Sequence, residues 1–292
     1  AETVLMQKLS AEESYDLIYF NQFLMYKFAK DGILQDLTDR INKSSILKEN
    51  YPAGELEKIK FNGKYYAGFN KLEGYPLPNV NKAITDKAGV DIGNLTTLDD
   101  FYNMLKTVKN YMETKEGKKP YYPFFVYMND IWDLQPWFSA VGARRGVFVD
   151  NTGKKYSPYV QDSARPVWEW LAKLYKEGLL DPEMADPIDG DKWAQKLATG
   201  KAVATYAYYD QIGGVTGKSS IQGFKLQMYP PLAGPAGAHH QPKSRTQWGI
   251  MFPSKTAKRA DCEKVVRAID DIFFSDAGAT LWCLGVEGIS YT

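Results

Sequence analysis

The pattern of hydrophobic and polar residues alternates between short apolar runs and amphipathic stretches along the whole chain. The run at 15–20, YDLIYF, predicts a buried strand of a parallel sheet, and 23–30 predicts a helix that ends at Gly32. Asn21 and Gln22 lie between the two, where ligands meet the carboxyl end of a strand and the amino end of a helix. We therefore expect both side chains to bind a ligand, with helix capping as the alternative role for Asn21.

The stretch 61–80 is predicted to carry the backbone out of one globular lobe and into a second. The dipeptide at 62–63, Asn-Gly, favours a type I′ turn between aromatic residues. Pro76 and Pro78 remove backbone donors, so they predict an irregular crossing segment and not an ordinary strand. A second crossing is predicted at 228–231. The crossings predict an amino-terminal lobe made of residues 1–78 and 230–292 and a carboxyl-terminal lobe made of residues 79–229.

The second lobe is predicted to repeat the arrangement of strand, polar turn and helix. Residues 124–127 predict a strand, 128–130 the turn above its carboxyl end, and 131–141 a helix. We interpret Trp137 as a core residue, and Trp132 as either a stacking platform or part of the buried helix face. A strand predicted at 202–206 leads to two tyrosines and an aspartate that we expect to face a ligand, Tyr208, Tyr209 and Asp210.

The remaining elements are predicted to form the scaffold. Thr97 to Asp100 has the spacing of a capping box, with Asp in place of Glu, in front of a long amphipathic helix. An Asn-Thr-Gly turn at 151–153 predicts a hairpin. Further helices are predicted at 34–41, 82–88, 166–178, 192–198, 263–274 and 276–284, and further strands at 224–228 and 248–252.

Composition narrows the function classes. A chain of 292 residues favours two compact units. Its 36 Lys and Arg nearly cancel its 35 Asp and Glu, which argues against nucleic acid or an anionic membrane as a partner. Cys262 and Cys283 are too few for a zinc site even with His239 and His240, so we expect no metal, and we interpret the two cysteines as buried thiols, with a disulfide left open.

Six phrases in order along the chain resemble bacterial extracellular solute-binding proteins of the maltose-binding-protein-like group, in its long-chain lipoprotein subgroup. They are YDLIYF with KDGILQDLTD, FNGKYYAGF, NKAITDKAGVDIGNLTTLDDFYNMLKTVK, LYKEGLLDPEM, ATGKAVATYAYYD and FFSDAGATLWCLGVEGISY. The resemblance implies an α/β, type II periplasmic-binding-protein-like fold with two lobes that close over a ligand. Compared with the family pattern, we expect the chain to be truncated at both ends, without the first strand of one lobe and the final helices of the other. NYMETKEGKKPYY replaces an oxygen-rich loop, so we expect no calcium site.

The resemblance also implies a function and a location. We expect a receptor, not an enzyme, that acts outside the cytoplasm as a monomer without a cofactor. Its partners would be an oligosaccharide and the membrane permease of an ABC importer. Sugars expose flat C–H faces edged by hydroxyls, so their sites need aromatic platforms and planar polar groups. The predicted platforms are Tyr75, Trp132, Tyr208, Tyr209 and Trp248, and the predicted polar residues are Asn21, Gln22, Glu73, Asn79, Asn129, Asp130, Asp210 and Arg245.

Two other function classes stay open at this point. A glycoside-active enzyme would pair Glu73 with Asp130 or Asp210 at about 5–10 Å, a spacing that the sequence does not fix. A peptide receptor on the same fold would also use a tyrosine-rich cleft. For the receptor we expect closure of two lobes around the ligand, with rotation at 74–79 and 228–231.

Overall fold

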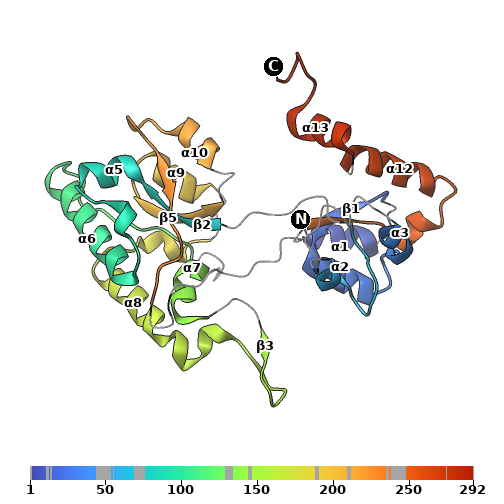
Figure 1. Ribbon diagram of the computed structural model, residues 1–292, viewed down its shortest axis with the longest axis horizontal. Coiled ribbons are helices and arrows are strands. Elements are labelled where there is room, and N and C mark those ends of the chain that lie inside the picture. Colours follow the sequence, from blue (N-terminus) through green and yellow to red (C-terminus); the bar gives the residue numbers. More distant parts are fainter. Residues whose placement is uncertain are drawn as a thin grey trace. The chain divides into compact units, whose positions relative to one another are not determined.

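The computed structural model divides the chain into two compact units, which we describe separately (Figure 1). Unit 1 consists of Ala1–Glu73 and Ser244–Thr292, and unit 2 of Gly74–Lys243. The structure describes residues 2–10, 13, 15–43, 54, 56–68, 76–128, 134–143, 147–187, 191–208, 212–234, 237, 248–273 and 275–291.

Unit 1 is built around a two-stranded antiparallel pair. Strand β1 (Ile18–Asn21) pairs with β7 (Trp248–Met251), and Gly68 forms an isolated bridge with Ile250. The parallel pairing predicted for 15–20 is therefore wrong, because the partner comes from the far part of the chain and runs the other way. The helices of unit 1 are α1 (Glu2–Ser10), α2 (Gln22–Lys30), α3 (Thr38–Lys43), η1 (Glu57–Ile59), α11 (Ser254–Ala257), α12 (Cys262–Phe273) and α13 (Asp276–Leu284).

The core of unit 1 lies between the strand pair and α2. Met25 and Phe28 on α2 have no exposed surface, and Met251 on β7 is equally enclosed. The predicted tight turn at 62–63 is confirmed, because Asn62 and Gly63 have φ of 50° and 75° and bring Phe61 and Lys64 into a bridge.

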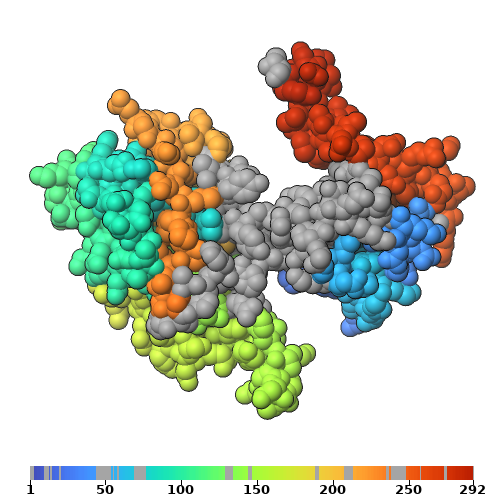
Figure 2. Space-filling view, in the orientation of Figure 1, coloured from blue at the N-terminus to red at the C-terminus, as the bar shows by residue number. Residues whose placement is uncertain are grey.

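The end of unit 1 carries an apolar helix with exposed side chains. Trp282 on α13 is 67% exposed, and Figure 2 shows α12 and α13 in red at the surface of unit 1. Gly278 allows α13 to approach α12, since a Cβ there would lie 1.9 Å from the carbonyl oxygen of Asp271. Cys262 is a buried free thiol as expected, whereas Cys283 is exposed, so the expectation of two buried thiols is wrong.

Unit 2 contains a three-stranded antiparallel sheet in the order β5-β2-β6. The strands are β2 (Pro76–Asn81), β5 (Ala204–Tyr208) and β6 (Leu226–Met228), with a separate hairpin of β3 (Phe148–Val149) and β4 (Lys155–Tyr156) where the sequence predicts one. The helices are α5 (Lys82–Lys87), η2 (Ile92–Asn94), α6 (Leu98–Thr114), α7 (Gln135–Phe138), η4 (Ser139–Val141), η5 (Pro158–Val160), η6 (Asp162–Ala164), α8 (Arg165–Lys176), η7 (Pro182–Ala185), α9 (Lys192–Ala198) and α10 (Ile212–Lys218).

The central strand β2 contains the two prolines that predict an irregular crossing, so this prediction is wrong. The β5 side of β2 is bonded by odd-numbered residues, as the bond from Asn81 N to the oxygen of Val203 shows. Pro76 and Pro78 face the β6 side, where Pro78 only accepts a bond, from the backbone N–H of Tyr229 at 3.1 Å. Because these prolines face away from β5, their missing N–H groups remove no hydrogen bond from the β2–β5 ladder.

The strand predicted at 124–127 is not formed, because only Phe124 pairs with neighbouring segments. Phe124 makes parallel bridges to Leu180 and to Ala204. The helix predicted at 131–141 is seen as α7 and η4, from Gln135 on, and residues 131–133 lie outside the described part.

The core of unit 2 is an aromatic cluster under α6. Thr97 and Asp100 form the predicted capping box at the start of this helix. Phe101 has no exposed surface, and its ring lies 5.2 Å from that of Phe124 and 6.0 Å from those of Trp137, Trp170 and Tyr229. The core role expected for Trp137 is thus confirmed.

Candidate functional site

Asn21 connects the strand pair of unit 1 to helix α2. Its side-chain oxygen Oδ1 accepts a hydrogen bond from the backbone N–H of Leu24 at 3.1 Å, which is the bond of an N-cap residue. The capping role that the sequence left open is confirmed. The side chain is half-buried at the amino end of a helix, where backbone N–H groups can donate hydrogen bonds to a ligand.

Gln22 is held in place by the next turn of the same helix. Its Nε2 donates to the hydroxyl of Tyr26 at 2.6 Å, and the Tyr26 ring lies 5.9 Å from the ring of Phe61. Burial raises the pKa of Tyr26 above its ordinary value, so its hydroxyl stays protonated at neutral pH. Gln22 is itself half-buried, which presents a positioned amide at the surface of unit 1.

Three aromatic residues lie near these two amides along the strand pair and at the start of α2. Trp248 lies opposite Asn21 in the β1–β7 register, and its ring stacks on Tyr19 with centroids 5.9 Å apart and an interplanar angle of 25°. Tyr19 is 42% exposed and Phe23 is 75% exposed. Sequence reasoning missed both. The alternation of a strand could have found Tyr19, because it lies two positions before Asn21 and so shares its face.

In unit 2 the described part of the chain shows how Pro76, Met128 and Tyr208, which flank the predicted clusters, relate to the sheet. Pro76, the first residue of β2, lies opposite Tyr208, the last residue of β5. The segment that ends at Met128 runs parallel to β5, because Phe124 bridges to Ala204. The carboxyl ends of parallel segments meet at the same edge of a sheet, so we expect Met128 to lie toward the edge at which Tyr208 ends β5 and Pro76 begins β2.

Among the remaining predicted site residues, the structure describes the side chain of Asn79, and most of the others lie outside the described residues. Asn79 on β2 has no exposed surface, and its Nδ2 donates to the backbone oxygen of Leu77 at 2.7 Å. The structure gives it a role inside the sheet, and its contact with a ligand stays a prediction. Tyr208 is described as the last residue of β5 only. The others lie outside the described residues: Glu73, Tyr75, Asn129, Asp130, Trp132, Tyr209, Asp210 and Arg245.

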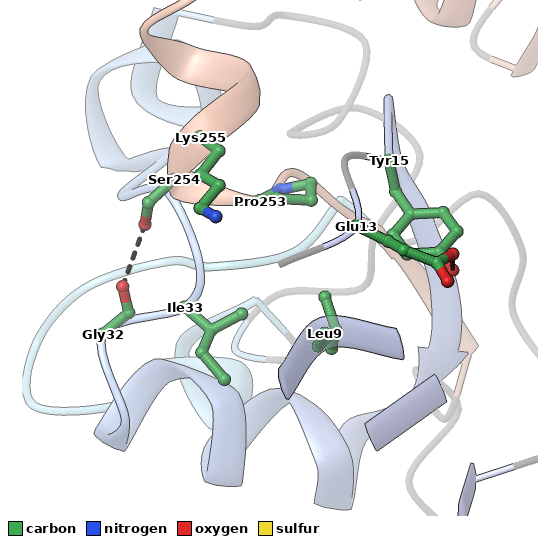
Figure 3. A pocket seen from close by; sticks show the side chains of 8 residues that line it. All are labelled: Leu9, Glu13, Tyr15, Gly32, Ile33, Pro253, Ser254 and Lys255. Atoms are coloured by element: carbon green, nitrogen blue, oxygen red, sulfur yellow. Dashed lines mark hydrogen bonds between the residues drawn. The ribbon is translucent and has the colours of Figure 1, made fainter. Parts of the chain in front are cut away.

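A pocket of about 220 Å³ lies near the end of the β1–β7 pair that is opposite to Asn21 and Trp248 (Figure 3). Leu9 and Ile33 contribute apolar side chains, while Glu13 accepts a hydrogen bond from the hydroxyl of Tyr15 at 2.8 Å. The hydroxyl of Ser254 donates to the backbone oxygen of Gly32 at 3.0 Å. None of the predicted site residues lines this pocket, so it is separate from the candidate site.

Within the described ranges, no group of three or more His, Cys, Asp and Glu side chains could hold a metal ion. The same part of the chain has no helix with the length and apolar character needed to cross a membrane.

Comparison with known proteins gives one curated lipoprotein and several solved structures of binding proteins. Lipoprotein LipO of Bacillus subtilis (strain 168) is 29% identical over 206 residues, which cover 67% of this chain and 40% of LipO. The ABC transporter associated binding protein from B. animalis subsp. lactis Bl-04, in complex with β-1,6-galactobiose, has a TM-score of 0.68 at 19% identity over 96% of this chain and 64% of its own. Maltose-bound T. maritima MalE3 has a TM-score of 0.72 at 17% identity, over 97% and 68% of the two chains. The chain thus spans two fifths of LipO and about two thirds of each solved chain.

These likenesses confirm the predicted fold class, an α/β fold of the type II periplasmic-binding-protein kind. The sequence model of the family described as "Bacterial extracellular solute-binding protein" matches residues 2–266. Because this match extends over most of the chain, the protein belongs to the bacterial extracellular solute-binding protein family.

Proposed function

We propose that this protein captures a carbohydrate, in the first place an oligosaccharide, outside the cytoplasm and passes it to the membrane permease of an ABC importer. The observation that carries the proposal is the group in unit 1 that combines two positioned amides with stacked aromatic rings, Asn21, Gln22, Tyr19 and Trp248. Family membership supports a receptor over an enzyme, since the family is one of binding proteins. Related solved structures hold β-1,6-galactobiose and maltose.

The chemistry of this group suits a sugar. A pyranose ring stacks its C–H face on an aromatic ring, and Tyr19 and Trp248 already form a stacked surface that is partly exposed. Its hydroxyls both donate and accept, which matches a side-chain amide such as that of Gln22. The bond to Tyr26 fixes this amide before the ligand arrives, so less conformational entropy is lost on binding.

We further propose that the ligand closes the two units around it, with Asn21 and Gln22 supplied by unit 1 and the residues after Met128 and Tyr208 by unit 2. The rotation expected at 74–79 and 228–231 needs revision, because Pro76–Asn81 and Leu226–Met228 are strands bonded into the sheet of unit 2.

A glycan panel read by thermal shift tests the binding function. A ligand at 100 times its dissociation constant should add about 2.7 kcal/mol to the free energy of unfolding. Maltose, β-1,6-galactobiose and kestose are the first probes. Trp248→Ala should weaken binding of the glycan that responds, whereas Tyr175→Ala, at a half-exposed tyrosine on α8, should not.

Two further measurements separate the alternatives. Chromatography of the recovered glycan should show it uncleaved, and cleavage products would indicate a glycoside-active enzyme. Solution scattering should show compaction when the glycan binds, and an unchanged radius of gyration with bound glycan would refute closure. If a peptide raises the thermal stability of the protein and no glycan does, the carbohydrate proposal is refuted.

A further inference from the structure

A second pocket lies wholly within unit 2, at the base of the hairpin formed by β3 and β4. The hairpin projects from the body of unit 2 (Figure 1), and the pocket has a volume of about 180 Å³. None of the predicted site residues is among those that line it. The lining residues come from the end of η4, from the hairpin, and from η5, η6 and the residue between them: Gly142, Ala143, Phe148, Tyr156, Pro158, Gln161 and Ser163.

Two aromatic side chains of the hairpin line this pocket. Phe148 and Tyr156 pair across the two strands, and their ring centroids lie 6.1 Å apart at an interplanar angle of 38°. Both residues are half-buried, so part of their surface is accessible. A cross-strand ring contact stabilises a short hairpin, but that role alone does not require a pocket with polar groups beside the rings.

The polar groups of the pocket come from the segment after the hairpin. Gln161 Nε2 donates to the backbone oxygen of Ser157 at 3.4 Å, which orients the amide and uses one of its two N–H donors. Ser163 adds a hydroxyl, which can both donate and accept. None of the seven described residues that line the pocket carries a charge. The pocket therefore suits a neutral ligand that has both apolar and hydroxyl surface.

The elements around the pocket are anchored in the core of unit 2. Tyr159 of η5 is buried, and its ring centroid lies 4.5 Å from that of Phe138. The backbone oxygen of Tyr159 accepts a hydrogen bond from Trp168 Nε1 at 2.8 Å. Gly142 ends η4 with φ of 71°, and the N–H of Ala143 donates to the oxygen of Phe138 at 3.1 Å. The pocket is thus formed before a ligand arrives, which reduces the entropy lost on binding.

We propose that this pocket is a second carbohydrate-binding site, which takes a single sugar ring. Pockets for drug-sized ligands occupy roughly 300–1,000 Å³, so a volume of about 180 Å³ fits one ring and not a complete oligosaccharide. The C–H face of the sugar stacks on Phe148 and Tyr156, and its hydroxyls bond to Gln161 and Ser163. This inference goes beyond the proposed function, because the pocket lies within unit 2 and shares no residue with the group around Asn21.

The test titrates isotope-labelled protein with maltose, β-1,6-galactobiose and kestose and follows the backbone amide resonances by NMR. At least one glycan should shift the amides of residues 148–163 in a saturable way. Phe148→Leu with Tyr156→Leu keeps apolar bulk in the hairpin but removes the flat rings, and should weaken this binding about tenfold. Gln161→Ala leaves both rings in place and should weaken it about threefold or more. The matched control is Val149→Ala, at a 62% exposed position on the other face of β3, and should leave the dissociation constant unchanged.

The inference is overturned if no glycan shifts the amides of residues 148–163, or if the folded double variant binds as tightly as the wild type. Should the double variant not fold, equal binding by Gln161→Ala and Val149→Ala overturns it. A proline-rich peptide that shifts these amides when no glycan does also overturns it, since aromatic grooves bind such peptides.

Trp248→Ala separates this inference from the proposed function, and it should leave the shifts at residues 148–163 unchanged. Glycan binding that depends on Trp248, without shifts at 148–163, refutes the second site and supports the proposed function. Shifts at 148–163 together with glycan binding that does not depend on Trp248 support the second site and refute the site proposed in unit 1.

Discussion

Asn21 caps helix α2, and we predict that variants can separate this role from the ligand contact that we propose for its side chain. Asn21→Ala removes the acceptor of the Leu24 N–H, which lies 3.1 Å from Oδ1. Loss of an N-cap costs about 1 kcal/mol, within a range of roughly 0.5–2 kcal/mol. Because α2 contributes Leu24, Met25 and Phe28 to the core of unit 1, this cost falls on the folding of the whole unit.

Urea unfolding of the purified variants measures the effect. In thermal unfolding of the same variants, a loss of about 1 kcal/mol from a unit of this size corresponds to a fall of roughly 4 °C in Tm. Asn21→Ser keeps a capping oxygen and should lose less than about half of what Asn21→Ala loses. If Asn21→Ser and Asn21→Ala destabilise unit 1 equally, the hydrogen bond does not act as a cap and the reasoning fails. If the serine variant is stable but binds a glycan more weakly, the amide itself contacts the ligand.

Three further predictions concern positions outside the site. Phe101→Ala should destabilise unit 2 by about 3–5 kcal/mol, measured by denaturant unfolding, because it empties the centre of the aromatic cluster; a loss below about 1 kcal/mol would contradict it. Hydrogen bonds from Thr97 and Thr96 lower the pKa of Asp100 from its ordinary 3.8 to about 2, so its contribution to stability is present above pH 4 and is lost as the pH falls toward 2. Acid titration of Asp100→Asn should therefore show a flatter loss between pH 4 and 2, and parallel curves would refute this. A thiol reagent should modify exposed Cys283 in the native protein and reach Cys262 only on unfolding; equal rates would contradict the burial of Cys262.

Local patterns in the sequence predict most of the longer helices of this fold, whereas the helix expected at 34–41 is wrong in its first half, because Leu34 forms a bridge with Pro253 and α3 begins at Thr38. The helix expected at 192–198 has these bounds in the structure, and the capping box of Thr97 and Asp100 forms as its spacing indicates. Such signals act over one or two turns, so they need no knowledge of a distant partner.

Strand partners are less accessible from the sequence. The run 15–20 indicates a buried strand, but its direction relative to β7 depends on a segment more than 200 residues away. The prolines of β2 look incompatible with a central strand until the structure shows which side their nitrogen atoms face. Asn21, Gln22 and Trp248 could be found as site candidates from polar and aromatic residues at element ends, whereas the stacking of Tyr19 on Trp248 depends on the β1–β7 register.

The prolines of β2 also determine the outline of the sheet. On one side the ladder with β5 continues to Pro76 and Tyr208. On the other side the pairing with β6 ends at Asn79 and Met228. At the next position the N–H of Tyr229 donates to the oxygen of Pro78, and Pro78 has no N–H to donate in return. Beside Pro76 and Pro78 a third strand would find carbonyl acceptors but no N–H donor, and within the described residues the sheet narrows from three strands to two toward Tyr208. The two prolines thus limit the hydrogen bonding that a neighbouring strand could form along this side of β2.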